Sequence, residues 1–163
     1  MFRGRRFETV GYPTIENIAS GLQNSYTRIL RKYRPTRVFI PALTDLHPDH
    51  QLVHREMLIS LFHAQGNIWP ELGTPLAEVP QVYEYACYCD FSDTPDYRIE
   101  GTSEMLQKKL DAIAAYRSQE QIASIVEGMR ASGPSEYFRA YPFRFYNPRS
   151  YESAFANAET VNG

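Results

Sequence analysis

The stretch Arg37-Val38-Phe39-Ile40, together with Asp45-Leu46-His47-Pro48-Asp49-His50 shortly after it, decides the fold class of this chain. The first stretch is rich in β-branched and aromatic residues and has apolar side chains on both faces, which is typical of a strand covered on both sides. Residues 41–48 predict a loop, and apolar positions at helical spacing predict a helix over 49–63. A helix is also predicted before the strand, over 14–33. The order helix, strand, loop, helix predicts an α/β sheet with flanking helices.

The second half of the chain continues this alternation. Helices are predicted over 102–114 and 122–129, the first with a capping-type start at Thr102. Strands are predicted over 82–91, where tyrosine and cysteine side chains share one face, and within the aromatic run 137–146.

We expect a single domain over residues 1–147 and a polar, loosely held tail over 148–163. Cys87 and Cys89 point to the same side of the predicted strand, an arrangement that does not suit a disulfide.

Composition and charge fit one soluble globular domain. The 163 residues are 43% hydrophobic and 22% charged, and the formal net charge is −2. Such a balance provides no cationic field to attract nucleic acid or an anionic membrane. No apolar run approaches the roughly 20 residues of a membrane-spanning helix, and no signal-peptide pattern is visible. We therefore expect a cytoplasmic protein, which the unpaired cysteines also favour.

Four basic residues crowd the end of the first predicted helix, where they complement the negative end of the helix dipole. These residues are Arg28, Arg31, Lys32 and Arg34. We interpret them as a solvated helix end and not as a binding patch.

The chemistry of the sequence gathers between the buried strand and the helix after it. His47 and His50 are three residues apart with Asp49 between them, and Asp45 precedes them. Open α/β sheets place their ligands at such strand–helix junctions. Imidazoles and carboxylates on one short turn can supply a metal ligand, a titrating group and its orienting partner. The alternative is that His47 and Asp49 merely cap the helix.

Two further histidines leave more than one interpretation open. His54 lies one helical turn after His50, so it can either share a metal with it or face the core. His63 stands near the helix end, where a histidine is favourable without any chemical role. A cation at the start of a helix also meets the positive end of the dipole, which carboxylates such as Asp45 and Asp49 can offset.

The chain resembles the PIG-L/LmbE-like zinc-dependent de-N-acetylases. The segment from Pro35 to His50 is similar to the second signature of that family. The stretches from Lys109 to Gln119 and Ser135-Glu136-Tyr137-Phe138 are similar to its later elements in order and approximate spacing. The resemblance covers most of the chain.

This resemblance implies a Rossmann-like, mostly parallel sheet and a zinc-activated water that removes an acetyl group from an N-acetylated sugar or a related amide. It implies that His50 is a zinc ligand, that His47 polarises or protonates the tetrahedral intermediate, and that Asp49 is the supporting carboxylate of His47. These roles agree with general principles, since zinc lowers the pKa of bound water and a nearby imidazole stabilises an oxyanion.

The chain departs from the family in one important respect. The family begins with a His-Pro-Asp-Asp motif that supplies two more zinc ligands and the general base, and this motif does not occur here. We therefore expect an incomplete domain, the C-terminal portion of such an enzyme, which is inactive alone. Unpaired strand edges in such a domain favour self-association.

Other interpretations remain open from the sequence. The chain can be a binding module without catalytic activity that retains the fold, and a remote alternative is a metallo-β-lactamase-like hydrolase. Asp45, Arg117 and Gln119 are candidates for contact with substrate, although polar residues at helix ends are more often structural. The aromatic residues of the 82–91 segment, Tyr83, Tyr85, Tyr88 and Phe91, can stack on a sugar, although an aromatic strand face is usually core.

Overall fold

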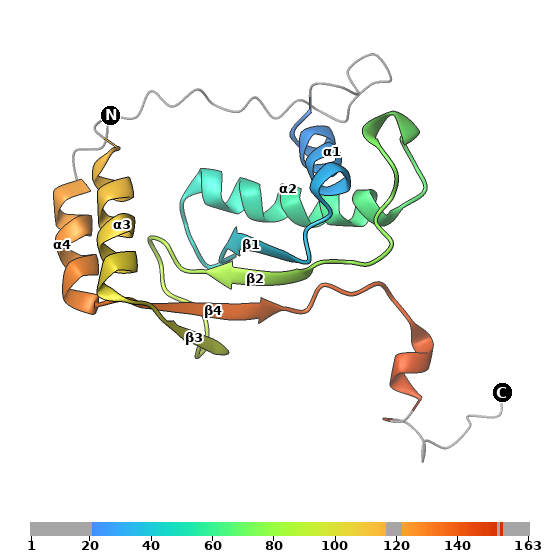
Figure 1. Cartoon of the computed structure of the whole chain (residues 1–163). Helices are drawn as coiled ribbons and strands as arrows, with labels where there is room; N and C mark the ends of the chain where they lie inside the picture. Colours follow the sequence, from blue (N-terminus) through green and yellow to red (C-terminus); the bar gives the residue numbers. More distant parts are fainter. Residues whose placement is uncertain (1–20, 117–121, 153, 155–163) are drawn as a thin grey trace.

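The computed structural model of the chain describes residues 21–116, 122–152 and 154 (Figure 1). Its helices are α1 (Leu22–Tyr33), α2 (Pro48–Gln65), α3 (Ser103–Ala114) and α4 (Ile122–Ser132), with short 3₁₀ turns η2 (Pro70–Leu72) and η3 (Pro148–Tyr151). Its strands are β1 (Arg37–Pro41), β2 (Gln81–Tyr85), β3 (Tyr97–Glu100) and β4 (Ser135–Tyr141). None of the helices in these ranges combines the length and apolar character of a membrane span.

The four strands form one mixed sheet in the order β1-β2-β4-β3. Strands β1 and β2 are parallel and are connected through α2, whereas β4 runs antiparallel to both β2 and β3. The α/β fold class is therefore confirmed. The expected predominance of parallel pairing is not found among the described strands, because β4 is reached from the α3–α4 pair and returns against the direction of β2.

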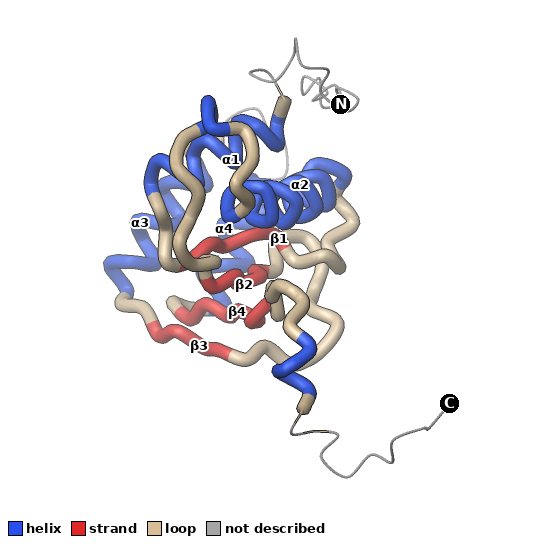
Figure 2. The backbone as a smooth tube through the Cα atoms, turned by 90° about the vertical axis from the view of Figure 1, so that its right-hand side faces the viewer, coloured by secondary structure: helices blue, strands red, loops and turns tan. Residues whose placement is uncertain are grey.

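Helices α1 and α2 lie together on one side of β1, and α3 packs against α4 at the end of the sheet toward which β2 points (Figure 1). Figure 2 shows the strands in their spatial order, with β1 nearest to α1 and α2. The core is built from one face of the parallel pair and the facing sides of these helices. Its buried residues are Leu30, Val38, Ile40, Leu61, Ala64, Leu76 and Val82.

The prediction that β1 is covered on both sides is wrong for the described part of the chain. Val38 and Ile40 are buried, but Phe39 between them is 49% exposed on the opposite face. The Phe39 ring stacks on Tyr83 and meets Phe138 edge-on, with ring centroids 5.4 Å and 5.2 Å away. This aromatic face is therefore partly open to solvent.

Most predicted elements are confirmed, with shifted ends. Helix α2 begins at Pro48, a favourable first helical residue. Thr102 accepts a hydrogen bond from the Met105 N–H at 3.2 Å and so caps α3 as expected. The first predicted helix is described only from Leu22 onward.

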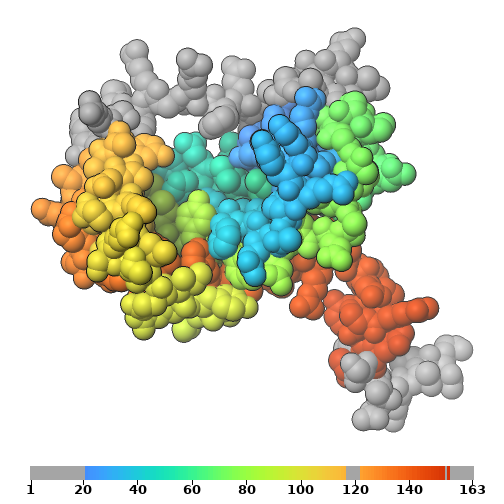
Figure 3. Space-filling model, in the orientation of Figure 1, coloured from blue at the N-terminus to red at the C-terminus, as the bar shows by residue number. Residues whose placement is uncertain are grey.

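Two predicted strands end earlier than the sequence suggested, and one strand was not predicted. Strand β2 ends at Tyr85, so Cys87 and Cys89 lie in a turn and not in a strand, and both are free thiols. Strand β4 ends at Tyr141, and β3 escaped prediction because all four of its residues are exposed. In Figure 3, the red segment that contains η3 projects from the body of the molecule.

The interpretation of the basic residues as a solvated helix end is wrong for Arg31. This side chain is only 3% exposed, and its guanidinium donates hydrogen bonds to backbone carbonyl oxygens at the end of α2 and in the connection after it. The acceptors are His63, Ala64, Gly66, Ile68, Trp69 and Gly73. Arg31 therefore ties α1 to the end of α2 that lies far from the histidine cluster.

Candidate active site

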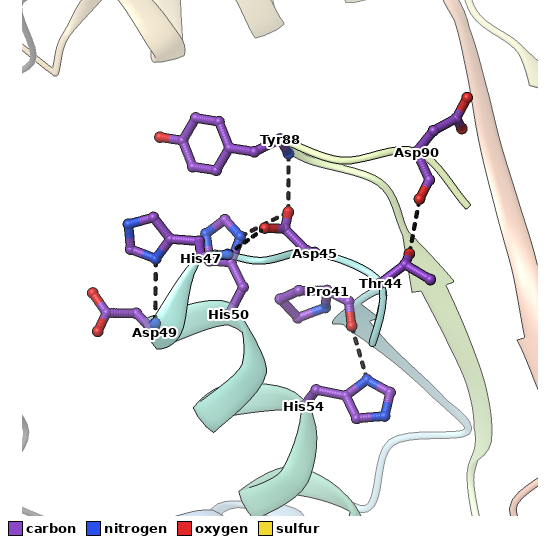
Figure 4. A network of polar contacts seen from close by, with 9 residues as sticks. All are labelled: Pro41, Thr44, Asp45, His47, Asp49, His50, His54, Tyr88 and Asp90. Atoms are coloured by element: carbon purple, nitrogen blue, oxygen red, sulfur yellow. Dashed lines mark hydrogen bonds and ion pairs between the residues drawn. The ribbon is translucent and has the colours of Figure 1, made fainter. Parts of the chain in front are cut away.

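The cluster predicted at the start of α2 is assembled around Asp45, in the loop that follows β1 (Figure 4). Asp45 is fully buried. Its Oδ1 accepts a hydrogen bond from the His47 N–H at 2.9 Å, and its Oδ2 accepts one from the Tyr88 N–H at 2.9 Å. One carboxylate thus fixes both the loop after β1 and the turn after β2.

Asp45 also faces the imidazole of His50, whose Nδ1 lies 3.0 Å from Oδ2. Burial alone raises the pKa of the Asp45 carboxyl group. The two backbone N–H donors and the nearby His50 imidazole outweigh this effect, so the pKa lies below its ordinary value. Asp45 is therefore an anion in the folded protein. Both of its oxygens are buried and face groups of this cluster, and the contact of Asp45 with substrate stays a prediction from sequence.

His47 is the N-cap residue of α2. Its Nδ1 accepts a hydrogen bond from the Asp49 N–H at 3.2 Å, an interaction that satisfies one of the free donors of the first helical turn. In a neutral imidazole this leaves the proton on Nε2, where it can be donated. Capping and chemistry, which the sequence presented as alternatives, therefore coexist in this residue.

The Tyr88 ring completes the cluster above the two histidines. It is stacked on His50 and on His47, with centroids 5.4 Å and 5.5 Å away, and the two imidazoles are 4.7 Å apart. The sequence placed Tyr88 on a strand face with Tyr83 and Tyr85. The end of β2 at Tyr85 releases the chain into a turn and brings Tyr88 back over the histidines.

The same turn carries a cysteine toward the cluster. One oxygen of Asp45, one ring nitrogen of His50 and the Cys87 sulfur all lie within 4.8 Å of one another. Burial raises the pKa of the Cys87 thiol, Asp45 raises it further, and Lys109 acts in the opposite direction. Carboxylate, imidazole and thiolate are all zinc ligands. The donor set of this group therefore fits a zinc ion.

His54 does not join this group. It is 2% exposed, and its Nδ1 lies 2.9 Å from the Pro41 carbonyl oxygen and 3.6 Å from Glu84 Oε1. Glu84 Oε1 accepts a hydrogen bond from the Leu43 N–H at 3.2 Å. Of the two interpretations of His54, the structure supports the core residue, which together with Glu84 holds the beginning of the Asp45 loop.

The remaining candidates occupy different places. Asp49 is exposed at the start of α2, where its backbone N–H, and not its carboxylate, contacts His47. Arg117 and Gln119 lie outside the described residues.

A cavity of about 570 Å³ adjoins the cluster at Cys87. It lies between the turn after β2, strand β4 and the α3–α4 pair, and its lining includes Tyr85, Phe138, Met129 and the ion-paired side chains of Lys109 and Glu136. Mixed aromatic and polar walls of this kind are typical of small-molecule sites. Sequence reasoning missed this cavity because its walls come from distant parts of the chain.

The fold of the chain is similar to those of three solved structures. The conserved protein TT1542 from Thermus thermophilus has a TM-score of 0.63 and 26% identity, over 85% of this chain and 66% of that one. The N,N'-diacetylchitobiose deacetylase from Pyrococcus horikoshii has a TM-score of 0.59 and 24% identity, over 77% of this chain and 53% of that one. GalB, the 4-carboxy-2-hydroxymuconate hydratase from Pseudomonas putida KT2440, has a TM-score of 0.59 and 17% identity, over 83% of this chain and 62% of that one.

These comparisons confirm the resemblance to a deacetylase at the level of the fold. The chain spans about half to two thirds of the length of the structures that it matches. No protein-family model and no curated protein matches the sequence.

Proposed function

We propose, from the fold shared with N,N'-diacetylchitobiose deacetylase, that this chain carries the site of a zinc-dependent hydrolase that removes an acetyl group from an N-acetylated sugar or a related amide. The observation that supports this proposal most directly is the pairing of two imidazoles with different tasks at the start of α2. His50 faces a buried carboxylate, and His47 has its Nδ1 occupied by a backbone N–H.

In this proposal His50 is a metal ligand. Zinc, when bound, lowers the pKa of a water molecule toward neutrality and polarises a carbonyl oxygen. The buried Asp45 carboxylate lies 3.0 Å from Nδ1 of this ring and holds its orientation. Tyr88, stacked on the same ring, restricts its rotation further.

His47 has a different task, since its Nε2 proton is available for donation. A substrate amide held beside His50 places its developing oxyanion within reach of such a donor, and a donor fixed in advance stabilises that charge without reorganisation. The hydrogen bond from the Asp49 N–H keeps the proton on Nε2. When the amine departs, the Nε2 proton of His47 passes to the leaving nitrogen, and the attacking water returns a proton to the ring.

The cavity beside Cys87 is the proposed place of the substrate. Its aromatic walls suit the face of a sugar ring, and the Lys109–Glu136 pair offers both a donor and an acceptor for hydroxyl groups.

The test is deacetylation of N-acetylglucosamine and N,N'-diacetylchitobiose by the full chain supplied with zinc, with zinc content measured in parallel. We expect His50→Ala to lose zinc and activity together. We expect His47→Ala to keep its zinc and to lose about 10²–10⁴-fold in turnover, the usual contribution of general acid–base catalysis. A zinc-loaded chain that releases no acetate from either substrate refutes catalysis by this chain, agrees with the expectation from sequence that it is inactive alone, and favours a binding module.

A further inference from the structure

We propose that Cys87 is a metal ligand, and that Asp45, His50 and Cys87 together form a three-ligand site for a divalent transition-metal ion. The inference rests on the proposed role of His50 and goes beyond it, because the resemblance to the deacetylases assigns only His50 in this chain. The thiol and the carboxylate become the second and third ligands.

The distances support this assignment. The ligand atoms of the three side chains lie within 4.8 Å of one another. Around a tetrahedral zinc, with bonds of about 2.0–2.3 Å, neighbouring ligand atoms are about 3.3–3.6 Å apart. Asp45 and His50 are already 3.0 Å apart, so Cys87 needs to approach them by up to about 1.5 Å to complete the group, a movement that rotation of its exposed side chain can supply.

The state of the His50 ring is a second, independent observation. Its Nδ1 is buried and makes no hydrogen bond of regular geometry with the described residues, and the Asp45 oxygen 3.0 Å away is an ion-pair partner only for a protonated ring. Where Nδ1 carries no proton, its lone pair meets those of the carboxylate, an unfavourable buried contact that a cation between the two groups relieves. A metal between the imidazole, the carboxylate and the thiolate satisfies this nitrogen.

Charge balance favours the same three ligands. A dication at the start of α2 meets the positive end of the helix dipole, so it needs anions nearby. Asp45 and a deprotonated Cys87 supply two negative charges, and binding of the metal releases the thiol proton to solvent. The ion is thereby neutralised by side chains of this chain alone.

The number of ligands indicates the type of site. Structural zinc sites usually have four protein ligands, whereas catalytic zinc sites have three and leave one position for water or substrate. Cys87 also lines the cavity of about 570 Å³, so an ion bound to its sulfur lies at the edge of that cavity. A three-ligand site is therefore open on the side where the proposed substrate binds.

The experiment is a titration of the reduced full chain with Co²⁺, followed by absorption, because a thiolate ligand adds a charge-transfer band in the near ultraviolet that oxygen and nitrogen ligands do not give. Cys89→Ser is the matched control, since Cys89 is a free thiol in the same turn but lies outside the group. We expect the band in the wild type and in Cys89→Ser. We expect Cys87→Ser to lose the band and to bind Co²⁺ at least about 10–100-fold more weakly, the cost of removing even an outer-shell partner.

The outcomes separate this inference from the proposed function. Co²⁺ binding that requires His50 but gives no thiolate band overturns the role of Cys87 and leaves the proposed hydrolase intact. A band that persists in Cys87→Ser and disappears in Cys89→Ser identifies Cys89 as the thiolate ligand, and this result also overturns the role of Cys87. Absence of Co²⁺ binding overturns both proposals. Circular dichroism of each variant establishes that the fold is retained, and the exposure of Cys87 makes Cys87→Ser a mild substitution.

Discussion

At the scale of single residues, Asp45 connects the most parts of the site. Its carboxylate joins the loop after β1, the start of α2 and the turn after β2, through His47, His50 and Tyr88. The sequence identified Asp45, His47 and His50 because they stand close together in one motif. It did not identify Cys87 or the ring contact of Tyr88, because these depend on where β2 ends.

The contribution of Asp45 to stability can be measured with Asp45→Asn. The amide removes the charge and presents a donor where Tyr88 also donates, so a buried N–H loses its acceptor. We expect the free energy of unfolding to fall by about 1.5–3 kcal/mol, the range for hydrogen bonds to a charged group. Urea unfolding of the metal-free chain measures this change. The matched control is Asp49→Asn, whose exposed side chain stabilises only through the helix dipole, by about 0.3–1 kcal/mol. Equal losses in the two variants contradict the assigned role.

His63 gives the molecule a dependence on pH that the sequence did not suggest. Burial lowers the pKa of His63, the nearby Arg31 lowers it further, and Glu56 acts in the opposite direction. The unfolded chain therefore binds a proton at a higher pH than the folded chain does. Stability from this residue is fully present above the unfolded pKa of about 6.5 and is lost as the pH falls below it.

The prediction is that wild-type protein loses stability between pH 7.5 and pH 5.5, and that His63→Gln loses less over the same interval. The two free energies of unfolding are measured in urea at each pH. If the free energy of unfolding falls equally in both proteins, His63 does not cause the loss of stability. The result also tests the sequence-based interpretation of His63 as a favourable cation at the end of α2, which a lowered pKa opposes.

At the scale of elements, most helices and strands could be predicted from the sequence, but β3 and the end of β2 could not. Periodicity locates β1 and α2 because their inward faces are apolar. Strand β3 has no buried face, and the turn after Tyr85 occurs within an aromatic run that continues the pattern of a strand. Hydrophobic patterns in the sequence indicate which residues are buried. A strand without a buried face is therefore missed, and so is the end of a strand when the pattern continues beyond it.

Arg31 shows the same limit, since its partners are backbone carbonyl groups far along the chain. Arg31→Met keeps the length of the apolar stem and removes every donor, which leaves the six carbonyl groups without this partner. We expect a loss of at least about 3 kcal/mol in the free energy of unfolding, because charge-assisted hydrogen bonds contribute about 1.5–3 kcal/mol each and some carbonyl groups regain water. Arg28→Met on the exposed face of α1 is the control and is expected to change it by less than about 0.5 kcal/mol.

At the scale of the whole molecule, the sheet is exposed in two ways. Strand β1 stands at one end of the strand order, so one of its edges is unpaired among the described strands. The aromatic face around Phe39 is also partly open, with Tyr97 48% exposed at its far side. Unpaired edges and exposed aromatic surface favour association with another copy of the chain. The expectation of self-association from the sequence thus stays a prediction, with a named surface.

Sedimentation velocity over micromolar concentrations tests this prediction. We expect the wild type to associate, and Phe39→Glu to shift it toward the monomer by placing a charge in the aromatic face. Tyr33→Glu is the matched control, since Tyr33 is an exposed aromatic residue on α1, away from the strands. A monomeric wild type at all concentrations, or equal shifts in the two variants, contradicts the prediction.

The carbonyl groups around Arg31 also have a consequence for experiments with chelators. Carbonyl oxygens that converge on one positive charge are the arrangement by which loops hold calcium, but here the cation is covalently part of α1. We therefore expect the order of the 66–73 connection to be independent of the ions in the medium. A chelator that removes a metal ion from the His50 end of α2 does not affect the contacts of Arg31 at the opposite end. We therefore expect any loss of order caused by a chelator to be confined to the His50 end.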